Sequence, residues 1–302
     1  QIAHLKHILK NTIGTLFSKK DNGKGMMKPL EVISIAVGGA VGVGNIGGVA
    51  TAIAVGGPGA AFWIWVAAFL GMMMKMAEVS LAVYYRSKDE KGGYYGGPTY
   101  YMEKGLGRAK GFKFWGVLAA IFGIGIFGNV FSMQNFTVAQ SVNATFGIPM
   151  LAVGLVYVGL TYLATVREIP WLGKLAAKVV PPMCVFYLVG GIVIIIVNIT
   201  QLPAALGLII SDAFTGTAAT GAFMGAGVAL IIRTGLSRAM FSSEAGWGTS
   251  PMIHASAKTE HPVKQGLWGA FEVFVGTMCI CTVTSLVIVV TGLWDSGLDG
   301  AP

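Results

Sequence analysis

The sequence predicts an all-α integral membrane protein in which two membrane helices are interrupted near their middle. Of the 302 residues, 54% are hydrophobic and 11% are charged, and the mean hydropathy is +0.70. A soluble domain of this length carries many more charges. The other two observations are a glycine-rich run inside one apolar stretch and a polar run inside a later one.

Seven apolar stretches approach or exceed the roughly 20 residues that cross a bilayer as a helix. The third is long enough to cross with a strong tilt, and the fourth is short. The predicted spans cover residues 31–55, 61–85, 114–146, 150–166, 179–200, 224–247 and 267–294. Residues 1–29 before them are basic and amphipathic, which predicts a helix lying on the cytoplasmic membrane surface.

The basic residues fall on one side of these spans. Most of the 21 Lys and Arg residues lie in four segments, at 1–29, 86–113, 167–178 and 248–266. The connections on the other side have none. Because cytoplasmic loops are enriched in Lys and Arg, the N-terminal segment is predicted to be cytoplasmic and the odd-numbered spans to run outward. We therefore predict a multi-pass protein of the cell membrane, and the net charge of +8 reflects this topology rather than binding of nucleic acid.

The first span contains a run that an ordinary helix does not tolerate. It reads Gly38-Gly39-Ala40-Val41-Gly42-Val43-Gly44-Asn45-Ile46-Gly47-Gly48, with six glycines in eleven residues. Each glycine costs roughly 1 kcal/mol of helix propensity relative to alanine, so the helix is predicted to unwind here. Unwound backbone at bilayer depth survives where it lines a cavity, because its N–H and C=O groups need partners. An ion and a solute are such partners, and the run therefore predicts a transporter.

The sixth span is interrupted as well. Beyond Ile232 it contains two arginines, Glu244 and several hydroxyl groups, which are costly at membrane depth unless they face a cavity or each other. The plainer alternative is that the span ends near Ile232. Five spans lie between the starts of the two interrupted spans, so the second unit is inverted relative to the first. Paired interruptions in inverted repeats indicate the binding site of a secondary transporter.

This repeat divides the chain into four predicted segments. A cytoplasmic basic segment covers 1–29, a first five-helix repeat 30–200, an extracellular connection 201–223, and the first two helices of a truncated second repeat 224–302. Because residue 1 is Gln and the chain stops after the seventh span, we expect this sequence to be part of a longer protein.

Three motifs resemble the alanine or glycine:cation symporter family, the sodium:alanine symporters. They are Gly44–Ile53, Gly56–Trp65 and Phe241–Ser250, and the resemblance covers nearly the whole chain. The usual family pattern has a larger aliphatic residue at Ala61 and Met at Ile64, and both departures concern packing. The resemblance implies sodium-coupled uptake of alanine and glycine on the inverted-repeat fold of the leucine transporter.

The same resemblance implies a role for Gly42–Asn45. This run is similar to the glycine-asparagine run in the first core helix of that fold, whose asparagine binds sodium and whose amides hold the substrate carboxylate. Asn45 also suits the position of a helix cap at the break, and the two roles are compatible.

An amino acid zwitterion and Na⁺ require different groups at the break. The carboxylate needs N–H donors, whereas the ammonium and the hard cation Na⁺ need oxygens. A helix that restarts after a break offers N–H groups, and the helix end before the break offers carbonyls. The predicted substrate-binding residues are Val43, Gly44, Gly47, Phe131, Gln134, Thr234, Phe241 and Ser242, and the predicted sodium ligands are Ala40, Val41, Asn45 and Thr51. For Phe131 and Gln134, the alternatives are packing and hydrogen bonding between helices.

Several charged residues fall within or near the spans. Lys75 and Glu78 are three residues apart on one helix, which predicts a local ion pair. His254 is predicted to be solvated in a cytoplasmic loop. Proton coupling through Glu78, Glu244 or Glu272 is the alternative to sodium coupling.

Other functional classes fit the sequence less well. An enzyme needs a nucleophile and a base at depth, and a channel normally shows a repeated filter loop, and neither pattern is present. Cys184, Cys279 and Cys281 lie in apolar spans and are predicted to be packing residues. We expect Na⁺ as the coupling ion without an organic cofactor, and a small amino acid and the lipid bilayer as partners. The sequence does not indicate an oligomeric state.

Overall fold

A computed structural model describes most of the chain, at residues 12, 14, 25–90, 92–130, 134–166, 169–215 and 224–296. Within these residues the regular structure is helical except for one short hairpin, as expected of an all-α membrane protein. The contacts divide the chain into two units that are interleaved in sequence. The first unit contains residues 1–39, 73–179 and 246–272, and the second contains residues 40–72, 180–245 and 273–302.

The first predicted span is interrupted within its glycine run. Helix α3 (Pro29–Ala40) ends inside the run, residues 41–46 form bends and turns, and helix α4 (Gly47–Gly56) follows. The Asn45 N–H donates to the Gly42 carbonyl (3.1 Å) and closes a turn. The predicted discontinuity is therefore confirmed.

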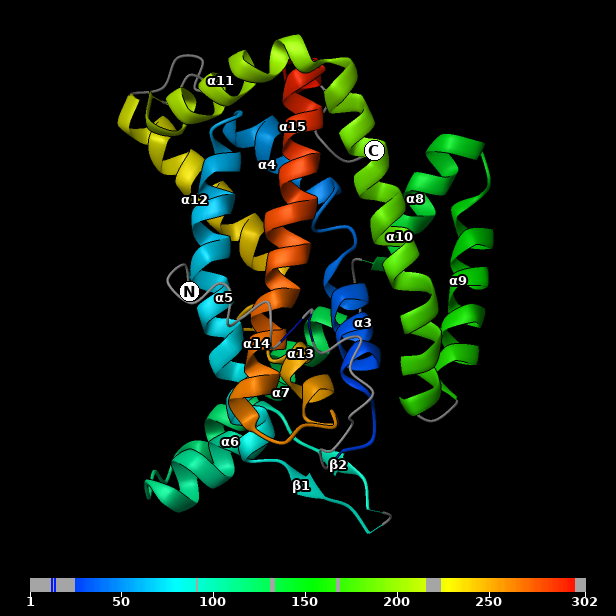
Figure 1. The fold of residues 1–302 in the computed structure, drawn as a ribbon, viewed down its shortest axis with the longest axis vertical. Helices are drawn as coiled ribbons and strands as arrows, with labels where there is room; N and C mark the ends of the chain where they lie inside the picture. The colour runs from blue at the N-terminus through cyan, green and yellow to red at the C-terminus, as the bar shows by residue number, and fades with distance from the viewer. Residues whose placement is uncertain are drawn as a thin grey trace. The chain divides into compact units, whose positions relative to one another are not determined.

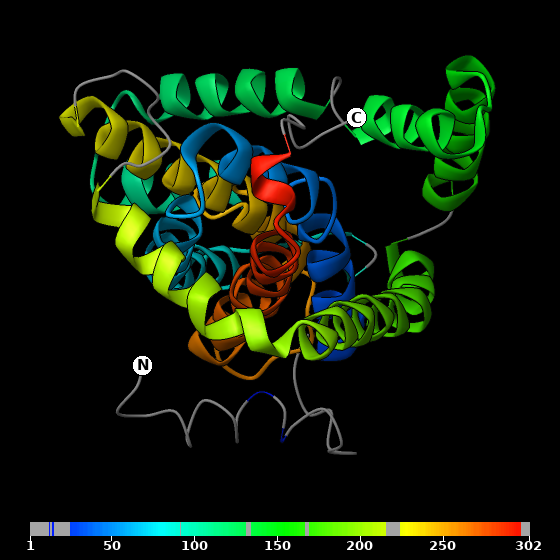
Figure 2. The ribbon, with the colours of Figure 1, turned by 90° about the horizontal axis from the view of Figure 1, so that it is seen from above.

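The second unit is built around α4. Helix α4 contacts α12 (Met224–Ser243) and α15 (Cys281–Val290), and α11 (Leu202–Thr215) contacts both α12 and α15 (Figures 1 and 2). The first half of α5 (Ala60–Tyr84) packs into the same apolar core. The most buried apolar side chains of this core include Val49, Ile53, Ile64, Ile209 and Ile231.

The sixth span continues as a helix through its polar part. Helix α12 runs to Ser243, so the residues just beyond Ile232 are helical rather than a loop, and the interruption predicted inside this span lies after the end of the helix, at Glu244. Glu244 then takes a left-handed conformation (φ 49°), which ends the helix, and the short helix α13 (Thr249–His254) follows.

The seventh span changes its winding partway. Helix α14 (Pro262–Val273) passes into the π-helix η4 (Phe274–Ile280), which passes into α15. Two short 3₁₀ turns, η3 (Ile199–Gln201) and η5 (Leu293–Asp295), lie elsewhere in the chain. A π-helical turn inside a longer helix is frequent at functional sites.

Helix α10 (Ile169–Val197) begins ten residues earlier than the predicted span 179–200. The prediction treated 167–178 as a loop because of its basic residues. Lys174 and Lys178 instead lie on the helix four residues apart, so the helix extends beyond its most apolar part.

Two helical segments cover most of the predicted single helix 114–146. They are α7 (Trp115–Val130) and α8 (Gln134–Phe146), and residues 131–133 between them lie outside the described part of the chain. Helix α7 contacts η2, the π-helix Met102–Ala109, and α8 lies beside α9 (Met150–Thr165) (Figure 1).

The predicted cytoplasmic loop 86–113 is largely ordered. Strands β1 (Ser87–Lys88) and β2 (Tyr94–Tyr95) pair antiparallel, and α6 (Pro98–Tyr101) leads directly into η2. The segment predicted as a loop is thus a hairpin followed by a helix.

Arg86 fixes the start of this segment. Its Nη1 donates to the carbonyls of Ala255 (3.0 Å) and Ala257 (2.9 Å), and its guanidinium lies over the ring of Tyr94 at 4.3 Å. Burial lowers the pKa of Arg86 from its ordinary value. The hairpin and residues 255–257 are therefore held together by one cation.

Three of the described helices are long and apolar enough to cross a membrane, by length and composition. They are Ala60–Tyr84, Ile169–Val197 and Pro262–Val290, and shorter apolar helices account for other predicted spans. The predicted amphipathic helix over 1–29 lies mostly outside the described residues.

Candidate functional site

Asn45 is the buried polar centre of the break between α3 and α4. It is 0% exposed, and its Nδ2 lies 2.9 Å from Ser242 Oγ, 2.8 Å from the Gly276 carbonyl oxygen and 3.6 Å from Cys281 Sγ. Its Oδ1 accepts a hydrogen bond from the Gly42 N–H at 3.3 Å. One amide side chain therefore joins the break to α12 and to the seventh span.

Asn45 does not cap α4. The N-cap position is Ile46, which makes no side-chain capping hydrogen bond, and the Asn45 side chain reaches away from the helix to other elements. The interpretation of Asn45 as a cap of the restarted helix is therefore wrong, because the amide is used for tertiary contacts.

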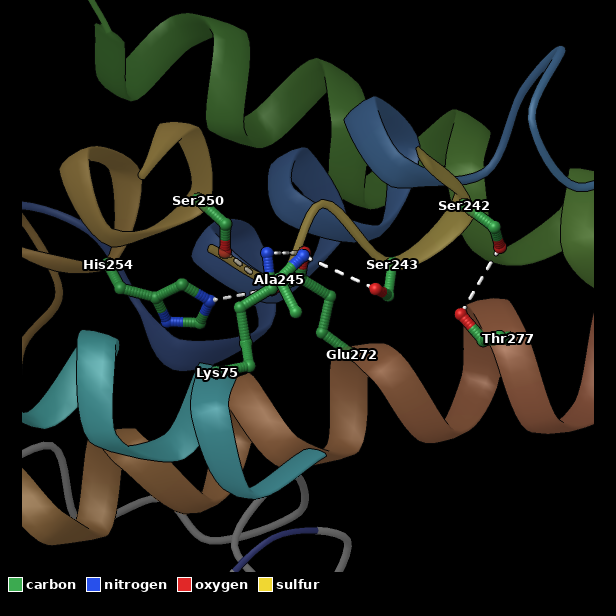
Figure 3. Close-up of polar contacts among 8 residues, drawn as sticks. All are labelled: Lys75, Ser242, Ser243, Ala245, Ser250, His254, Glu272 and Thr277. Atoms are coloured by element: carbon green, nitrogen blue, oxygen red, sulfur yellow. Dashed lines mark hydrogen bonds and ion pairs between the residues drawn. The ribbon is translucent and has the colours of Figure 1, made fainter. Parts of the chain in front are cut away.

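The π-helix η4 supplies the carbonyl that Asn45 binds. In a π-helical turn the backbone hydrogen bonds join residues five apart instead of four apart, which changes the carbonyls that are available to side chains. The hydroxyl oxygens of Ser242 and Thr277 lie 3.2 Å apart beside this carbonyl (Figure 3), and Thr277 is completely buried. Oxygens from α12 and η4 therefore gather around Asn45.

A second hydroxyl holds the backbone of Asn45. Thr284 Oγ1 lies 3.0 Å from the Asn45 carbonyl oxygen and 2.8 Å from the Ile280 carbonyl oxygen, and the Tyr187 hydroxyl lies 2.7 Å from Thr284 Oγ1. Both the side chain and the main chain of Asn45 are thus bound by the seventh span.

Three predicted substrate-binding residues lie together at the break. A Cβ added to Gly44 would lie 2.8 Å from Phe241 Cδ1 and 3.3 Å from Ser242 Cα. The backbone of Gly44 is therefore in close contact with the end of α12, and only glycine fits this approach.

The hydroxyls of Thr51 and Thr234 make hydrogen bonds within their own helices. Thr51 Oγ1 donates to the Gly47 carbonyl (2.8 Å), and Thr234 Oγ1 donates to the Leu230 carbonyl (2.7 Å), each within its own helix. Thr234 Cβ would lie 3.4 Å from a Cβ on Gly56, at the end of α4 opposite the break. The structure does not bring these two hydroxyls to Asn45.

Ala40, Val41 and Val43 are the other predicted residues at the break. Ala40 is buried at the end of α3, and Val41 packs near Gly276, where an added Cβ would lie 3.7 Å from Val41 Cγ2. The Val43 carbonyl accepts the Gly48 N–H at 2.8 Å, which ties the turn to the first residues of α4.

The structure does not describe the side chains of the two residues predicted from the third span. Gln134 begins α8 in the first unit, and its side chain lies outside the described part of the chain, as does all of Phe131. Their predicted roles stay predictions.

The grouped oxygens suit a cation of low charge. Among the described residues, no group of three or more His, Cys, Asp or Glu side chains is placed to hold a metal ion. The Ser242 hydroxyl and the Gly276 carbonyl lie beside the Asn45 amide nitrogen, and the Thr277 hydroxyl lies 3.2 Å from Ser242 Oγ. All three are neutral oxygen ligands of the kind that hard cations accept. The amide group presents either its nitrogen or its oxygen to them by turning about its last bond.

The sequence reasoning missed the contribution of the seventh span. Gly276, Thr277 and Thr284 are close to Asn45, and Cys281, predicted to be a packing residue, also contacts Ser242 at 3.1 Å. A glycine followed by several hydroxyl residues within an apolar span was the signal that pointed to them.

The charged residues of the first unit are paired differently from the prediction. Lys75 Nζ lies 3.4 Å from Glu272 Oε1, and the nitrogen His254 Nε2 lies 3.3 Å from Glu272 Oε2. His254 is 0% exposed, so the prediction that it is solvated is wrong. Lys75 thus contacts a glutamate on another helix, which sequence spacing does not reveal.

Comparisons with known proteins agree with the motifs. A family model described as the sodium:alanine symporter family matches residues 1–302. The chain is 40% identical to the sodium/alanine symporter AgcS of Methanococcus maripaludis, over 95% of this chain and 63% of that protein. It is 37% identical to the putative sodium/proton-dependent alanine carrier protein YrbD of Bacillus subtilis, over 100% of this chain and 60% of that protein.

A third relative carries a different name. The probable sodium/glutamine symporter GlnT of Bacillus subtilis is 39% identical over 92% of this chain and 56% of its own length. The chain thus spans about three fifths of the length of the curated relatives it matches. These relatives are transporters, not enzymes.

Proposed function

The chain belongs to the sodium:alanine symporter family, and from this premise we propose that it carries the broken-helix site of a sodium-coupled importer of small neutral amino acids. Alanine and glycine are the proposed substrates, and Na⁺ is the proposed coupling ion. The leucine-transporter-type inverted repeat, with its first half at 30–200 and its second half starting at 224, belongs to the same proposal.

One observation supports this proposal most strongly. The side chain of Asn45 is fully buried and binds Ser242 Oγ and the Gly276 carbonyl, inside a span that glycines have unwound. Buried polar groups are costly in an apolar unit unless they are paired or bind a ligand. A cluster of neutral oxygens at a helix break is the arrangement that a transported cation needs.

The cation is proposed to bind where the amide of Asn45 faces the hydroxyls. In the structure Nδ2 faces Ser242 and Gly276, and Oδ1 receives only the long bond from Gly42. Turning the amide puts Oδ1 beside the oxygens of Ser242, Gly276 and Thr277. We propose these four groups as sodium ligands, with the carbonyls of Ala40 and Val41 as further candidates.

The substrate is proposed to bind at the restarted helix. Free N–H groups and the positive end of the α4 dipole favour a carboxylate at Val43, Gly44 and Gly47. Phe241 and Ser242 contact this backbone and are proposed to wall the site.

The orientation of the chain is also a proposal. The excess of Lys and Arg in 1–29, 86–113, 167–178 and 248–266 supports a cytoplasmic N-terminal segment in the cell membrane. Under this topology the α5 end near Gly59 and the α11 segment face outward.

The proposed function is tested by uptake into proteoliposomes that contain the full-length protein, because this chain spans about three fifths of the length of its relatives and is expected to hold only part of the second repeat. We expect radiolabelled alanine to accumulate when sodium is high outside, and accumulation to saturate with alanine and to stop when the sodium gradient is collapsed. A proton gradient in sodium-free buffer is the matched control. Accumulation that follows the proton gradient and ignores sodium would contradict sodium coupling, and no alanine accumulation under either gradient would contradict the function.

A further inference from the structure

The hydroxyl group of Thr284 joins the break to two other helices. Thr284 lies on α15, is 5% exposed, and places its Oγ1 3.0 Å from the Asn45 carbonyl oxygen and 2.8 Å from the Ile280 carbonyl oxygen. The hydroxyl of Tyr187, on α10, lies 2.7 Å from the same Oγ1. These residues all belong to the second unit, so their contacts form one cluster inside a single compact part of the chain.

The chemistry of the partners sets the direction of these hydrogen bonds. A carbonyl oxygen only accepts, so the single hydroxyl hydrogen of Thr284 is directed at the carbonyls of Asn45 and Ile280. The hydroxyl of Tyr187 then donates to the lone pairs of Thr284 Oγ1. A hydroxyl that accepts a hydrogen bond becomes a better donor, so Tyr187 strengthens the bonds that Thr284 donates.

The Asn45 carbonyl depends on this hydroxyl. At the start of α4 the Gly48 N–H donates to the Val43 carbonyl at 2.8 Å, and no backbone N–H among the described residues donates to the Asn45 carbonyl. Asn45 is 0% exposed, and a buried carbonyl without a donor costs free energy comparable to a lost hydrogen bond. Thr284 therefore supplies the hydrogen bond that the broken helix does not.

Both peptide groups that flank Asn45 are held in place. Its N–H donates to the Gly42 carbonyl at 3.1 Å, and its own carbonyl accepts from Thr284. Because peptide groups are planar, fixing the groups on both sides of a residue fixes the direction of its Cα–Cβ bond. The side chain of Asn45 is thereby directed toward Ser242 Oγ and the Gly276 carbonyl.

We propose that Thr284 and Tyr187 are positioning residues of the sodium site, which hold the main chain of Asn45 so that its amide meets the other ligands. The inference rests on the proposed function, because it deepens the role given there to Asn45. Neither hydroxyl is a proposed ligand. Tyr187 acts through Thr284, and Thr284 acts through the Asn45 carbonyl.

The sodium dependence of alanine uptake tests this proposal, in proteoliposomes that contain the full-length protein. Thr284→Val keeps the shape of the side chain and removes the hydroxyl. We expect the sodium concentration for half-maximal uptake to rise roughly fivefold, the factor that one net hydrogen bond contributes. The maximal rate per folded protein at saturating sodium is expected to stay close to that of the wild type.

Two further variants serve as rescue and control. Thr284→Ser restores the hydroxyl and is expected to return the sodium dependence to that of the wild type. Thr291→Val is the matched control, because Thr291 is exposed and its Oγ1 donates to the Val287 carbonyl (2.7 Å), four residues earlier in the chain. We expect its sodium dependence to be unchanged.

A double variant tests the order of action. Tyr187→Phe alone is expected to raise the half-maximal sodium concentration by roughly twofold, because the Thr284 hydroxyl still donates to Asn45 but is less polarised. Adding Tyr187→Phe to Thr284→Val is expected to cause no further rise, since residues that act through one another are not additive. Effects that multiply in the double variant would overturn the proposed relay.

Two outcomes of the uptake experiment overturn the positioning role of Thr284. The first is an unchanged sodium dependence in Thr284→Val. The second is a loss of maximal rate at an unchanged half-maximal sodium concentration, because a residue with a merely structural role behaves in this way. Should Thr284→Val fail to fold, an unchanged sodium dependence in Tyr187→Phe overturns the proposal.

Hydrogen exchange of the purified protein separates this proposal from the proposed function. The amides of residues 41–50 are expected to exchange roughly fivefold faster in Thr284→Val than in Thr291→Val, because the carbonyl that holds the turn has lost its donor. Equal exchange in the two variants overturns the positioning role. A wild type that does not accumulate alanine, together with this difference in exchange, would contradict the proposed function alone.

Discussion

Replacing Gly44 by valine is expected to reduce sodium-dependent alanine uptake to background while the protein still folds. A Cβ at this position would lie 2.8 Å from Phe241 Cδ1 and 3.3 Å from Ser242 Cα, so the larger side chain displaces the end of α12 from the break. Both contacts belong to the proposed substrate site. The measurement is the initial rate of alanine uptake, normalised to the amount of folded protein in the membrane.

The matched control is Gly39→Val in the same glycine run. A Cβ on Gly39 meets no atom within 4 Å, and the residue is exposed. We expect uptake by this variant to stay close to that of the wild type. Equal losses in the two variants would show that the run needs glycines only for its backbone conformation, and normal uptake by Gly44→Val would remove the break from the binding site.

Replacing Lys75 by methionine is expected to lower the free energy of unfolding by about 3–5 kcal/mol at neutral pH. The substitution removes the cation that lies 3.4 Å from Glu272 Oε1 and leaves that carboxylate buried with an uncompensated charge. The double variant Lys75→Met/Glu272→Gln is expected to recover most of this loss, because it removes both charges. Chemical unfolding in detergent measures each free energy.

Lys264→Met is the control for this prediction. Lys264 also pairs with a glutamate, Glu260, but both side chains are substantially exposed, at 40% and 55%. Exposed ion pairs contribute at most about 1 kcal/mol, so little change is expected. A small effect of Lys75→Met, or a double variant no more stable than the single one, would contradict the buried pair.

Interruption of the first span was predictable from composition alone. A run of six glycines in eleven residues is a local property, and local propensity decides where a helix unwinds. The sequence analysis placed Gly44, Phe241 and Ser242 in one predicted site, but it did not predict that they are in contact. The family resemblance, rather than spacing, supplied the idea that these segments meet.

Other features depend on distant contacts and leave little local signal. Asn45 binds Gly276, which lies 231 residues further along the chain, and nothing local in the sequence indicates that the two residues meet. Hydropathy does not report the π-helical winding of η4. Lys75 was assigned to Glu78 because they are near in sequence, whereas its ion-pair partner Glu272 is on another helix.

Helix boundaries were the least predictable part of the fold. Helix α10 continues through basic residues that resemble a loop, since lysines on a helix end are compatible with a membrane surface. The predicted helix 114–146 covers α7 and α8, which contact different elements.

The central claim is that Asn45 is the group through which sodium and substrate meet. Alanine affinity measured across a sodium series, for the wild type and Asn45→Ala, tests it most directly, with the exposed Asn198→Ala as control. Linkage requires that a cation which tightens substrate binding is itself tightened by substrate. We predict that Asn45→Ala raises the sodium concentration for half-maximal binding and weakens alanine binding at low sodium, with recovery at high sodium. Curves that coincide with the wild type after correction for folded protein would contradict the claim.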